Sequence, residues 1–238
     1  MIEWFEEWFG EEYLALYPHR DDAEAERAVA LIRRAVPWRE GWRVLDVACG
    51  PGRHARALAA AGANCFGLDL SAALLRRARA VTRAPLIRAD MRRLPVRPGS
   101  MDLAVNLFTS FGYFASDEEH RQALSEMGAT LRRDGWIVID FLNATAVRTK
   151  LVRSEDTSLA GQPVRIERDV IGDGRFVRKQ IATADGRVFT ERVRLFSADD
   201  LAAMLDDAGI EIRHRFGDYD GAGLTEDSPR VVLMGRRR

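Results

Sequence analysis

The chain has 238 residues, enough for one large domain that buries roughly 70–75% of the surface its unfolded form exposes. Hydrophobic residues make up 47% and charged residues 30%, a composition that excludes a disordered or fibrous chain. The 36 basic residues equal the 36 acidic ones in number, which argues against a dedicated partner among nucleic acids.

An aromatic stripe opens the chain. Trp4, Phe5, Trp8 and Phe9 recur at helical spacing, so residues 1–40 are predicted to form a helical segment. This stripe has two interpretations: it packs on the domain's own core, or it forms a lid over a pocket.

Short apolar runs alternate with helical stretches over residues 42–141. The predicted strands are 42–48, 63–68, 85–89, 102–107 and 136–141. The predicted helices are 53–61, 72–80 and 117–133, with Ser71 and Asp117 as the expected N-caps of the last two. Such alternation is typical of a parallel sheet with helices on both faces.

The pattern changes after residue 141. Residues 163–169, 176–183 and 187–196 alternate apolar and polar side chains, and Gly-containing turns at 172–174 and 185–186 separate them. We therefore predict a small antiparallel β insertion over 163–196. A helix at 198–208 and strands at 210–216 and 230–236 follow, so residues 1–238 are interpreted as one domain.

Residues 44–55 read Val-Leu-Asp-Val-Ala-Cys-Gly-Pro-Gly-Arg-His-Ala, and they place two glycines just beyond a buried strand. Glycines here let a ligand approach the backbone, and the next helix points free N–H groups at the same crevice. Asp69 ends the second strand, about where a carboxylate accepts both hydroxyls of a ribose. Asp90 and Met91 end the third strand, where they suit an adenine. Together these strand ends indicate a ligand that contains adenosine.

With these features the sequence resembles the class I S-adenosylmethionine-dependent methyltransferases over roughly residues 13–141, and more loosely the dTDP-amino-sugar N-methyltransferases. The looser likeness rests on the Cys-Gly-x-Gly turn, Asp-Met-Arg at 90–92 and Ser-Phe-Gly-Tyr at 110–113. The resemblance implies a Rossmann-like fold with a seven-stranded, mostly parallel sheet, helices on both faces and an antiparallel insertion after strand five. It also implies in-line transfer of a methyl group from the sulfonium of S-adenosylmethionine to a nitrogen or oxygen of a small molecule, which leaves S-adenosylhomocysteine.

The same resemblance implies site residues. Asp46, Ala48, Gly50 and Gly52 would line the methionine part of the cofactor, and Asp69 would hold the ribose. The base would lie against Leu70, Asp90 and Met91, and the sulfonium against Leu107 and Phe108. Tyr17 and Arg20 resemble a Tyr-x-x-Arg pair that holds the cofactor carboxylate, and Tyr113 is the candidate for the catalytic polar group.

Alternatives remain at this point. Gly50, Gly52 and Asp69 also fit an NAD-dependent oxidoreductase, although Asp46 within the first strand counts against it, and a catalytically silent cofactor-binding subunit shares the motif. The insertion is interpreted as the acceptor side of the pocket or as a dimer interface, so the protein is a monomer or a homodimer.

Other residue types give weaker indications. Cys49 and Cys65 indicate buried thiols in a reducing compartment, and neither a signal peptide nor a membrane span is apparent, so we expect a cytoplasmic protein. No set of residues has metal-ligand spacing, and we expect no metal. His54 and His120 are interpreted as surface histidines or histidines with their hydrogen bonds satisfied.

Overall fold

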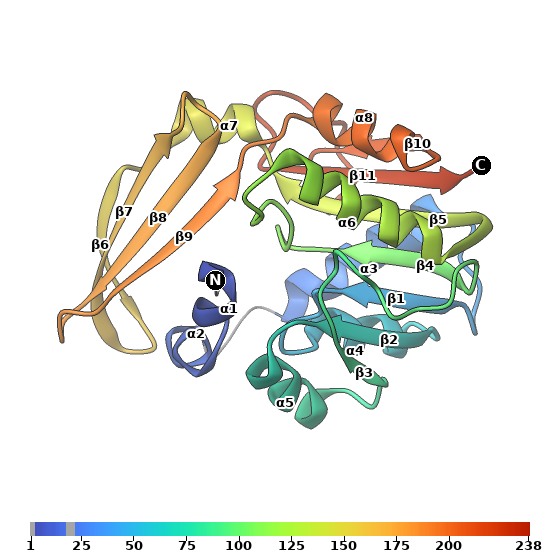
Figure 1. Cartoon of the computed structure of the whole chain (residues 1–238), viewed down its shortest axis with the longest axis horizontal. Helices are drawn as coiled ribbons and strands as arrows, with labels where there is room; N and C mark the ends of the chain where they lie inside the picture. Colours follow the sequence, from blue (N-terminus) through green and yellow to red (C-terminus); the bar gives the residue numbers. More distant parts are fainter. Residues whose placement is uncertain (1–2, 18–21) are drawn as a thin grey trace.

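The structure is a computed structural model that describes residues 3–17 and 22–238. Its larger sheet contains seven strands: β1 (Arg43–Val47), β2 (Asn64–Asp69), β3 (Leu86–Arg88), β4 (Met101–Asn106), β5 (Leu131–Leu142), β10 (Ile210–Phe216) and β11 (Arg230–Arg237). Their order across the sheet is β10-β11-β5-β4-β1-β2-β3 (Figure 1). β11 runs antiparallel to both of its neighbours, while β1 to β5 pair in parallel. The predicted fold class is confirmed.

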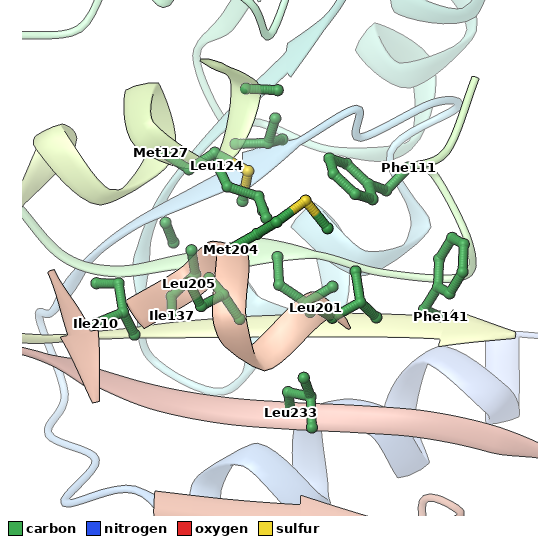
Figure 2. Close-up of a cluster of buried hydrophobic side chains, with 14 of the residues drawn as sticks. Phe111, Leu124, Met127, Ile137, Phe141, Leu201, Met204, Leu205, Ile210 and Leu233 are labelled. Atoms are coloured by element: carbon green, nitrogen blue, oxygen red, sulfur yellow. The ribbon is translucent and has the colours of Figure 1, made fainter. Parts of the chain in front are cut away.

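Helices cover both faces of this sheet because its central strands are apolar on both sides. The helices α3 (Asp22–Ala35) and α4 (Arg53–Ala60) bury apolar side chains against one face, together with Val44 and Val138. The other face carries α6 (Asp117–Thr130) and α8 (Ala198–Asp207), and Leu45 and Ile137 point to that side. Figure 2 shows this second core, in which Leu124 of α6 lies close to Met204 of α8.

A second, four-stranded antiparallel sheet leaves the chain after β5. It consists of β6 (Ser154–Leu159), β7 (Gln162–Ile171), β8 (Phe176–Thr183) and β9 (Val188–Arg194), in that spatial order. The short helices α1 (Trp4–Trp8) and α2 (Glu11–Leu16) lie between the two sheets in Figure 1. Trp8 and Leu16 pack with Val164, Ile166 and Ile181, so the N-terminal helices share a core with the second sheet.

Three details differ from the predicted elements. Ser116, not Asp117, caps α6: its Oγ accepts from the backbone N–H of Glu119, and the Glu119 carboxylate accepts from the backbone N–H of Ser116. α6 also ends at Thr130, because Leu131 already pairs with Met101 at the start of β5. Both β6 and the helix α7 (Ala144–Lys150) were absent from the prediction. The helix α5 (Ala72–Val81), which follows β2 of the seven-stranded sheet, is capped by Ser71 as expected.

Candidate functional site

A cavity of about 810 Å³ lies at the carboxyl ends of β1 to β4 and extends to the inner face of the second sheet. This is the edge at which open α/β sheets bind ligands. The cavity is at the upper end of the usual range for ligand pockets, roughly 300–1,000 Å³. Among the predicted site residues, those in its lining are Ala48, Gly50, Asp69, Leu70, Asp90, Met91, Leu107, Phe108 and Tyr113.

The two glycines of the turn after β1 have different surroundings. Gly50 lines the cavity with a φ of +55°, and a Cβ there would meet no atom within 4 Å. A Cβ at Gly52, where φ is +87°, would lie 3.0 Å from Cβ of Ala78 in α5. Gly50 therefore leaves open space for a ligand, whereas Gly52 lets α4 and α5 pack closely and does not line the cavity.

Asp69 joins the turn to the end of β2. Its Oδ2 accepts from the backbone N–H of Gly50 and its Oδ1 from that of Ser71, both at 2.8 Å. Burial raises the pKa of this carboxyl group, and these backbone hydrogen bonds oppose that rise. Each carboxylate oxygen keeps a further lone pair, so Asp69 can still accept hydrogen bonds from two hydroxyl groups.

Asp46 lies below the turn and does not line the cavity. It is 1% exposed, and its Oδ2 has no hydrogen-bond partner among the residues that the structure describes. Burial raises the pKa of Asp46 to about 8, and the nearby charge of Asp69 adds to the rise. A buried carboxylate of this kind is stabilised by a positively charged partner.

His54 is the second residue of α4, the helix beyond the turn, and it lines the cavity although it is only 5% exposed. Its Nε2 finds no partner within the described chain, so the expectation of a surface or satisfied histidine was wrong. Burial, followed by the positive charges of Arg53 and Arg230, lowers the pKa of His54 to about 3. The imidazole is neutral, and its ring nitrogen is available to a ligand. His120 is also fully buried, with Nδ1 2.7 Å from the carbonyl oxygen of Ser116 and Nε2 without a described partner.

Asp90 lines the cavity below β3, but Arg92 already holds its carboxylate. Nη2 of Arg92 lies 2.6 Å from Oδ2 of Asp90, and Nε lies 3.1 Å from Oδ1. Burial by itself raises the pKa of Asp90, but the hydrogen bonds from Arg92 outweigh it and hold that pKa below its usual value. Nη1 of Arg92 also contacts Glu3, 2.7 Å away, and Glu119, 2.5 Å away. The end of β3 is thereby tied both to the residue before α1 and to α6.

The chain turns sharply at the end of β4. Phe108 and Thr109 both have left-handed backbone conformations, with φ of 61° and 57°. Asp140 of β5 supports this turn: its Oδ2 accepts from the backbone N–H of Phe108 at 2.6 Å, and its carbonyl oxygen accepts from that of Thr109 at 3.0 Å. Non-glycine residues rarely adopt this conformation, and such strain concentrates at functional sites.

The Phe108 ring has a guanidinium group over it from each of two other elements. Arg53 of α4 lies 4.2 Å from the ring centroid, and Arg230 of β11 lies 5.1 Å from it. Arg230 in turn donates to both oxygens of the buried Asp140 at 2.8 Å, and Tyr219 donates its hydroxyl proton to the same carboxylate. Neither Asp140 nor the two arginines were predicted. Asp140 gave no signal because a carboxylate inside an apolar run looks like an ordinary strand residue.

Tyr113 lies on the side of the cavity that faces α1. Its hydroxyl donates to the carbonyl oxygen of Thr109 at 2.6 Å, and its ring packs against Trp4 and Phe9 with centroids 5.3 Å apart in each case. The hydroxyl proton is therefore engaged, and the oxygen can serve as a hydrogen-bond acceptor. Within the aromatic stripe, Phe5 and Trp8 are buried in the core, and Phe5 and Phe9 line the cavity.

The second sheet forms the far wall of the cavity, to which Lys179 and Glu191 contribute. Tyr17 contacts the same inner face of this sheet: its hydroxyl accepts from Nζ of Lys179 at 2.7 Å, although Tyr17 itself does not line the cavity. Arg20, its predicted partner, lies outside the described residues. The alternation of the insertion identified one apolar face, but the prediction did not note the charged residues on that face.

Residues 3–17 and 22–238 were searched for clusters of metal-ligating side chains and for membrane-spanning helices. No group of three or more histidine, cysteine, aspartate or glutamate residues in these ranges is arranged to hold a metal ion. Within the same ranges, no helix is both long and apolar enough to cross a membrane.

Comparisons with known proteins point to one family. Residues 44–135 match a methyltransferase domain. A dTDP-3-amino-3,6-dideoxy-α-D-glucopyranose N,N-dimethyltransferase from Streptomyces fradiae is 30% identical over 231 residues, which cover 89% of this chain and 84% of that protein.

Solved structures agree with this match. A sugar N-methyltransferase from Streptoalloteichus superposes with a TM-score of 0.71 and 30% identity, over 96% of this chain and 94% of its own. An amino pentose methyltransferase from Micromonospora echinaspora, solved with S-adenosylmethionine bound, has a TM-score of 0.68 and 25% identity, over 96% and 97% of the two chains.

Proposed function

The chain belongs to the class I S-adenosylmethionine-dependent methyltransferases, and from this premise we propose that it methylates the amine nitrogen of a small molecule. The family membership decides against the alternative of a hydride-transferring oxidoreductase. Choice of nitrogen over oxygen is supported by the relatives above, two of which are named as N-methyltransferases of sugars or amino sugars. One observation carries the proposal: a single cavity extends from the carboxyl ends of β1 to β4, where the cofactor would bind, to the second sheet, which contributes the carboxylate of Glu191.

The described residues fit S-adenosylmethionine. A ligand at the glycine turn would fill the open space beside Gly50 and meet Nε2 of His54, a buried atom without a partner among the described residues. The buried carboxylate of Asp46 lies just outside the cavity lining, and its Oδ2 also lacks a described partner. The methionine part of S-adenosylmethionine carries an ammonium group and a carboxylate. The carboxylate of Asp46 and the imidazole of His54 suit a ligand with these groups. Asp69 suits the ribose hydroxyls, and Leu70 and Met91 supply apolar contacts for the base.

S-adenosylmethionine supplies a methyl group on an electron-poor sulfonium, so the protein has mainly to position the reactants and exclude water. Leu107, Phe108 and Tyr113 all line the cavity, and Leu107 and Phe108 would face the sulfonium. Phe5 of α1 and Phe9, which directly follows that helix, line the same space. The Tyr113 hydroxyl, which donates to the carbonyl oxygen of Thr109, would accept a hydrogen bond from the acceptor amine.

Two sugar nucleotides that differ in one group test the proposal. One is dTDP-3-amino-3,6-dideoxy-α-D-glucopyranose, and the other is the same nucleotide with a hydroxyl in place of the amine. We expect radiolabelled S-adenosylmethionine to transfer its methyl group to the amino nucleotide and to leave S-adenosylhomocysteine. Methylation of the hydroxy nucleotide alone, or of neither compound, would contradict the proposal, whereas calorimetric binding of S-adenosylmethionine checks the cofactor separately.

A further inference from the structure

A row of charged side chains crosses the inner face of the second sheet. Arg168 of β7 pairs in register with Lys179 of β8, and Lys179 pairs with Glu191 of β9. Residues directly opposite one another on adjacent strands point to the same face. All three side chains line the cavity, and each is between 20% and 24% exposed. We call Arg168, Lys179 and Glu191 the charged row.

The charged row lies between two apolar rows of the same face. The rows on its two sides are Val170, Val177 and Val193, and Ile166, Ile181 and Phe189. The second of these packs under Trp8 of α1. Partly buried charges are costly unless they are paired, and packing alone is served at least as well by apolar residues. The charged row therefore points to a role in recognition.

Glu191 is held in place but keeps capacity for a ligand. Its Oε1 accepts from the indole N–H of Trp8 at 2.8 Å, and its Oε2 lies 3.4 Å from Nζ of Lys179. Each oxygen retains a lone pair. The other acidic residues on this side of the cavity, Glu6 and Glu7, occupy exposed positions of α1. Glu191 is thus the more sheltered and better oriented carboxylate.

Glu191 is also the member of the row nearest to Tyr113. Two residues further along β9, Val193 lies so close to Gly112 that a Cβ there would be 2.9 Å from its Cγ1. The backbone N–H of Arg194 donates to the carbonyl oxygen of Gly112 at 2.8 Å. Since Gly112 precedes Tyr113, the Glu191 end of the row faces the space beside Phe108 and Tyr113.

Arg168 stands at the other end, two strands away, which is about 10 Å in an antiparallel sheet. One of its guanidinium nitrogens, Nη2, contacts Oε1 of Glu155 on β6 at 2.6 Å, so the group leans away from Glu191. Nη1 lies 3.4 Å from the carbonyl oxygen of Val152. The guanidinium retains further N–H donors, and its planar fork suits a phosphate.

We propose that the charged row is the acceptor-binding subsite. Glu191 binds the acceptor's amine as an ammonium and then takes one proton from it, which frees the nitrogen lone pair for the methyl group, while Arg168 binds a phosphate of the same molecule. Lys179 positions Glu191 between these two contacts. The spacing of the row selects a phosphorylated amine and disfavours an α-amino acid, whose amine and carboxylate share one carbon. This inference rests on the proposed function, because it takes an amine as the acceptor.

Calorimetry with the two sugar nucleotides above tests the row on the full chain saturated with S-adenosylhomocysteine. The wild type is expected to bind the amino nucleotide at least 10-fold more tightly than the hydroxy nucleotide, the lower end of the effect of a hydrogen bond to a charged group. Glu191→Gln keeps an oxygen for Trp8 but loses the charge, so the ratio of the two dissociation constants should fall close to one. Arg168→Gln should weaken both nucleotides about equally, by at least 10-fold, and leave their ratio unchanged.

Two matched controls lie on the opposite face of β7, where Arg165 pairs with Glu167 at 3.1 Å. Arg165→Gln and Glu167→Gln should leave both dissociation constants within twofold of the wild type. Unchanged binding of S-adenosylhomocysteine shows that each variant is folded.

Any of three binding results would overturn the inference: a wild type that binds neither nucleotide, a Glu191→Gln variant that keeps its preference for the amine, or glycine binding as tightly as the amino nucleotide. Normal methylation of the amine by both row variants would overturn the inference while leaving the proposed function intact. Tight binding of the amino nucleotide that depends on Arg168, without any methyl transfer to its amine, would overturn the proposed function and leave the binding subsite intact.

Discussion

Asp140 of β5 and Phe108 at the end of β4 are joined by a hydrogen bond of 2.6 Å between a carboxylate and a backbone N–H. The same carboxylate holds Arg230, whose guanidinium lies over the Phe108 ring. One buried side chain therefore sets both the backbone of Phe108 and the group that covers its ring. The position of Phe108 at the cavity depends on a residue that does not line the cavity itself.

Replacement of Asp140 tests that dependence. Asp140→Ala removes the acceptor of Phe108 and leaves Arg230 without its buried partner, which typically costs about 3–5 kcal/mol. We expect a loss of this size in the free energy of unfolding, measured by denaturant titration. Tyr219→Phe, which removes one hydrogen bond to the same carboxylate, should cost only about 0.5–1.5 kcal/mol. Equal losses in the two variants would show that the Arg230 pair contributes little.

Alanine substitutions at the two glycines of the turn should have different effects: one should mainly lower cofactor affinity and the other should mainly lower stability. Both have positive φ, so alanine brings comparable backbone strain at each, of about 1–2 kcal/mol. Gly50→Ala adds only a methyl group directed into open space, and we expect it to weaken S-adenosylmethionine binding with little further loss of stability. Gly52→Ala presses on Ala78 and should lower the melting temperature more. Normal cofactor binding by Gly50→Ala would show that the open space beside Gly50 is not needed for the cofactor.

Asp69→Ala should weaken S-adenosylmethionine binding by roughly 10–150-fold, the effect of about 1.5–3 kcal/mol for hydrogen bonds to a charged group. The loss has two sources, because Asp69 faces the cavity and also holds the N–H of Gly50. Ser197→Ala is the control away from the cavity: it removes the cap of α8 and should cost about 1 kcal/mol of stability without a change in affinity. Calorimetry measures both variants, and an unaltered affinity in Asp69→Ala would remove this residue from the ribose site.

Asp46 predicts a pH dependence of stability in the protein without ligand. Its pKa is about 8 in the folded protein, against an ordinary value of 3.8, so between these values the folded state binds the proton and the unfolded state does not. Stability contributed by protonated Asp46 is therefore present at low pH and is lost as pH rises towards 8. Relative to Asp46→Asn, the wild type should lose free energy of unfolding from about pH 4 to pH 8. A constant difference between the two proteins over this range would refute the raised pKa.

The strands and the cavity edge could be predicted because they depend on local pattern. Apolar runs that end at glycine or aspartate predicted β1 and β2, and with them the placement of Gly50 and Asp69 at one edge. β6 was missed because its residues from Ser154 to Ser158 are all polar, as an edge strand tolerates. No periodicity distinguishes such a segment from a loop.

The electrostatic partners could not be predicted, because they come from distant parts of the chain. Asp90 was expected to be available to a ligand, but Arg92 holds its carboxylate and links it to Glu3. Asp140 and Arg230 are 90 residues apart, and only the antiparallel pairing of β5 with β11 brings them together. Charge pairs of this kind follow from the completed sheet and leave no short-range pattern.

The shared core of α1 and the second sheet has a consequence for biosynthesis. Trp8 and its hydrogen-bond partner Glu191 are 183 residues apart, so the N-terminal helix lacks its packing surface until most of the chain has been made. At about 5–20 residues per second, the aromatic side chains of α1 wait roughly 10–40 s on the ribosome. During this interval they are a target for chaperones or for self-association. Pulse-proteolysis of stalled nascent chains should find residues 4–9 protected only after β9 has left the exit tunnel.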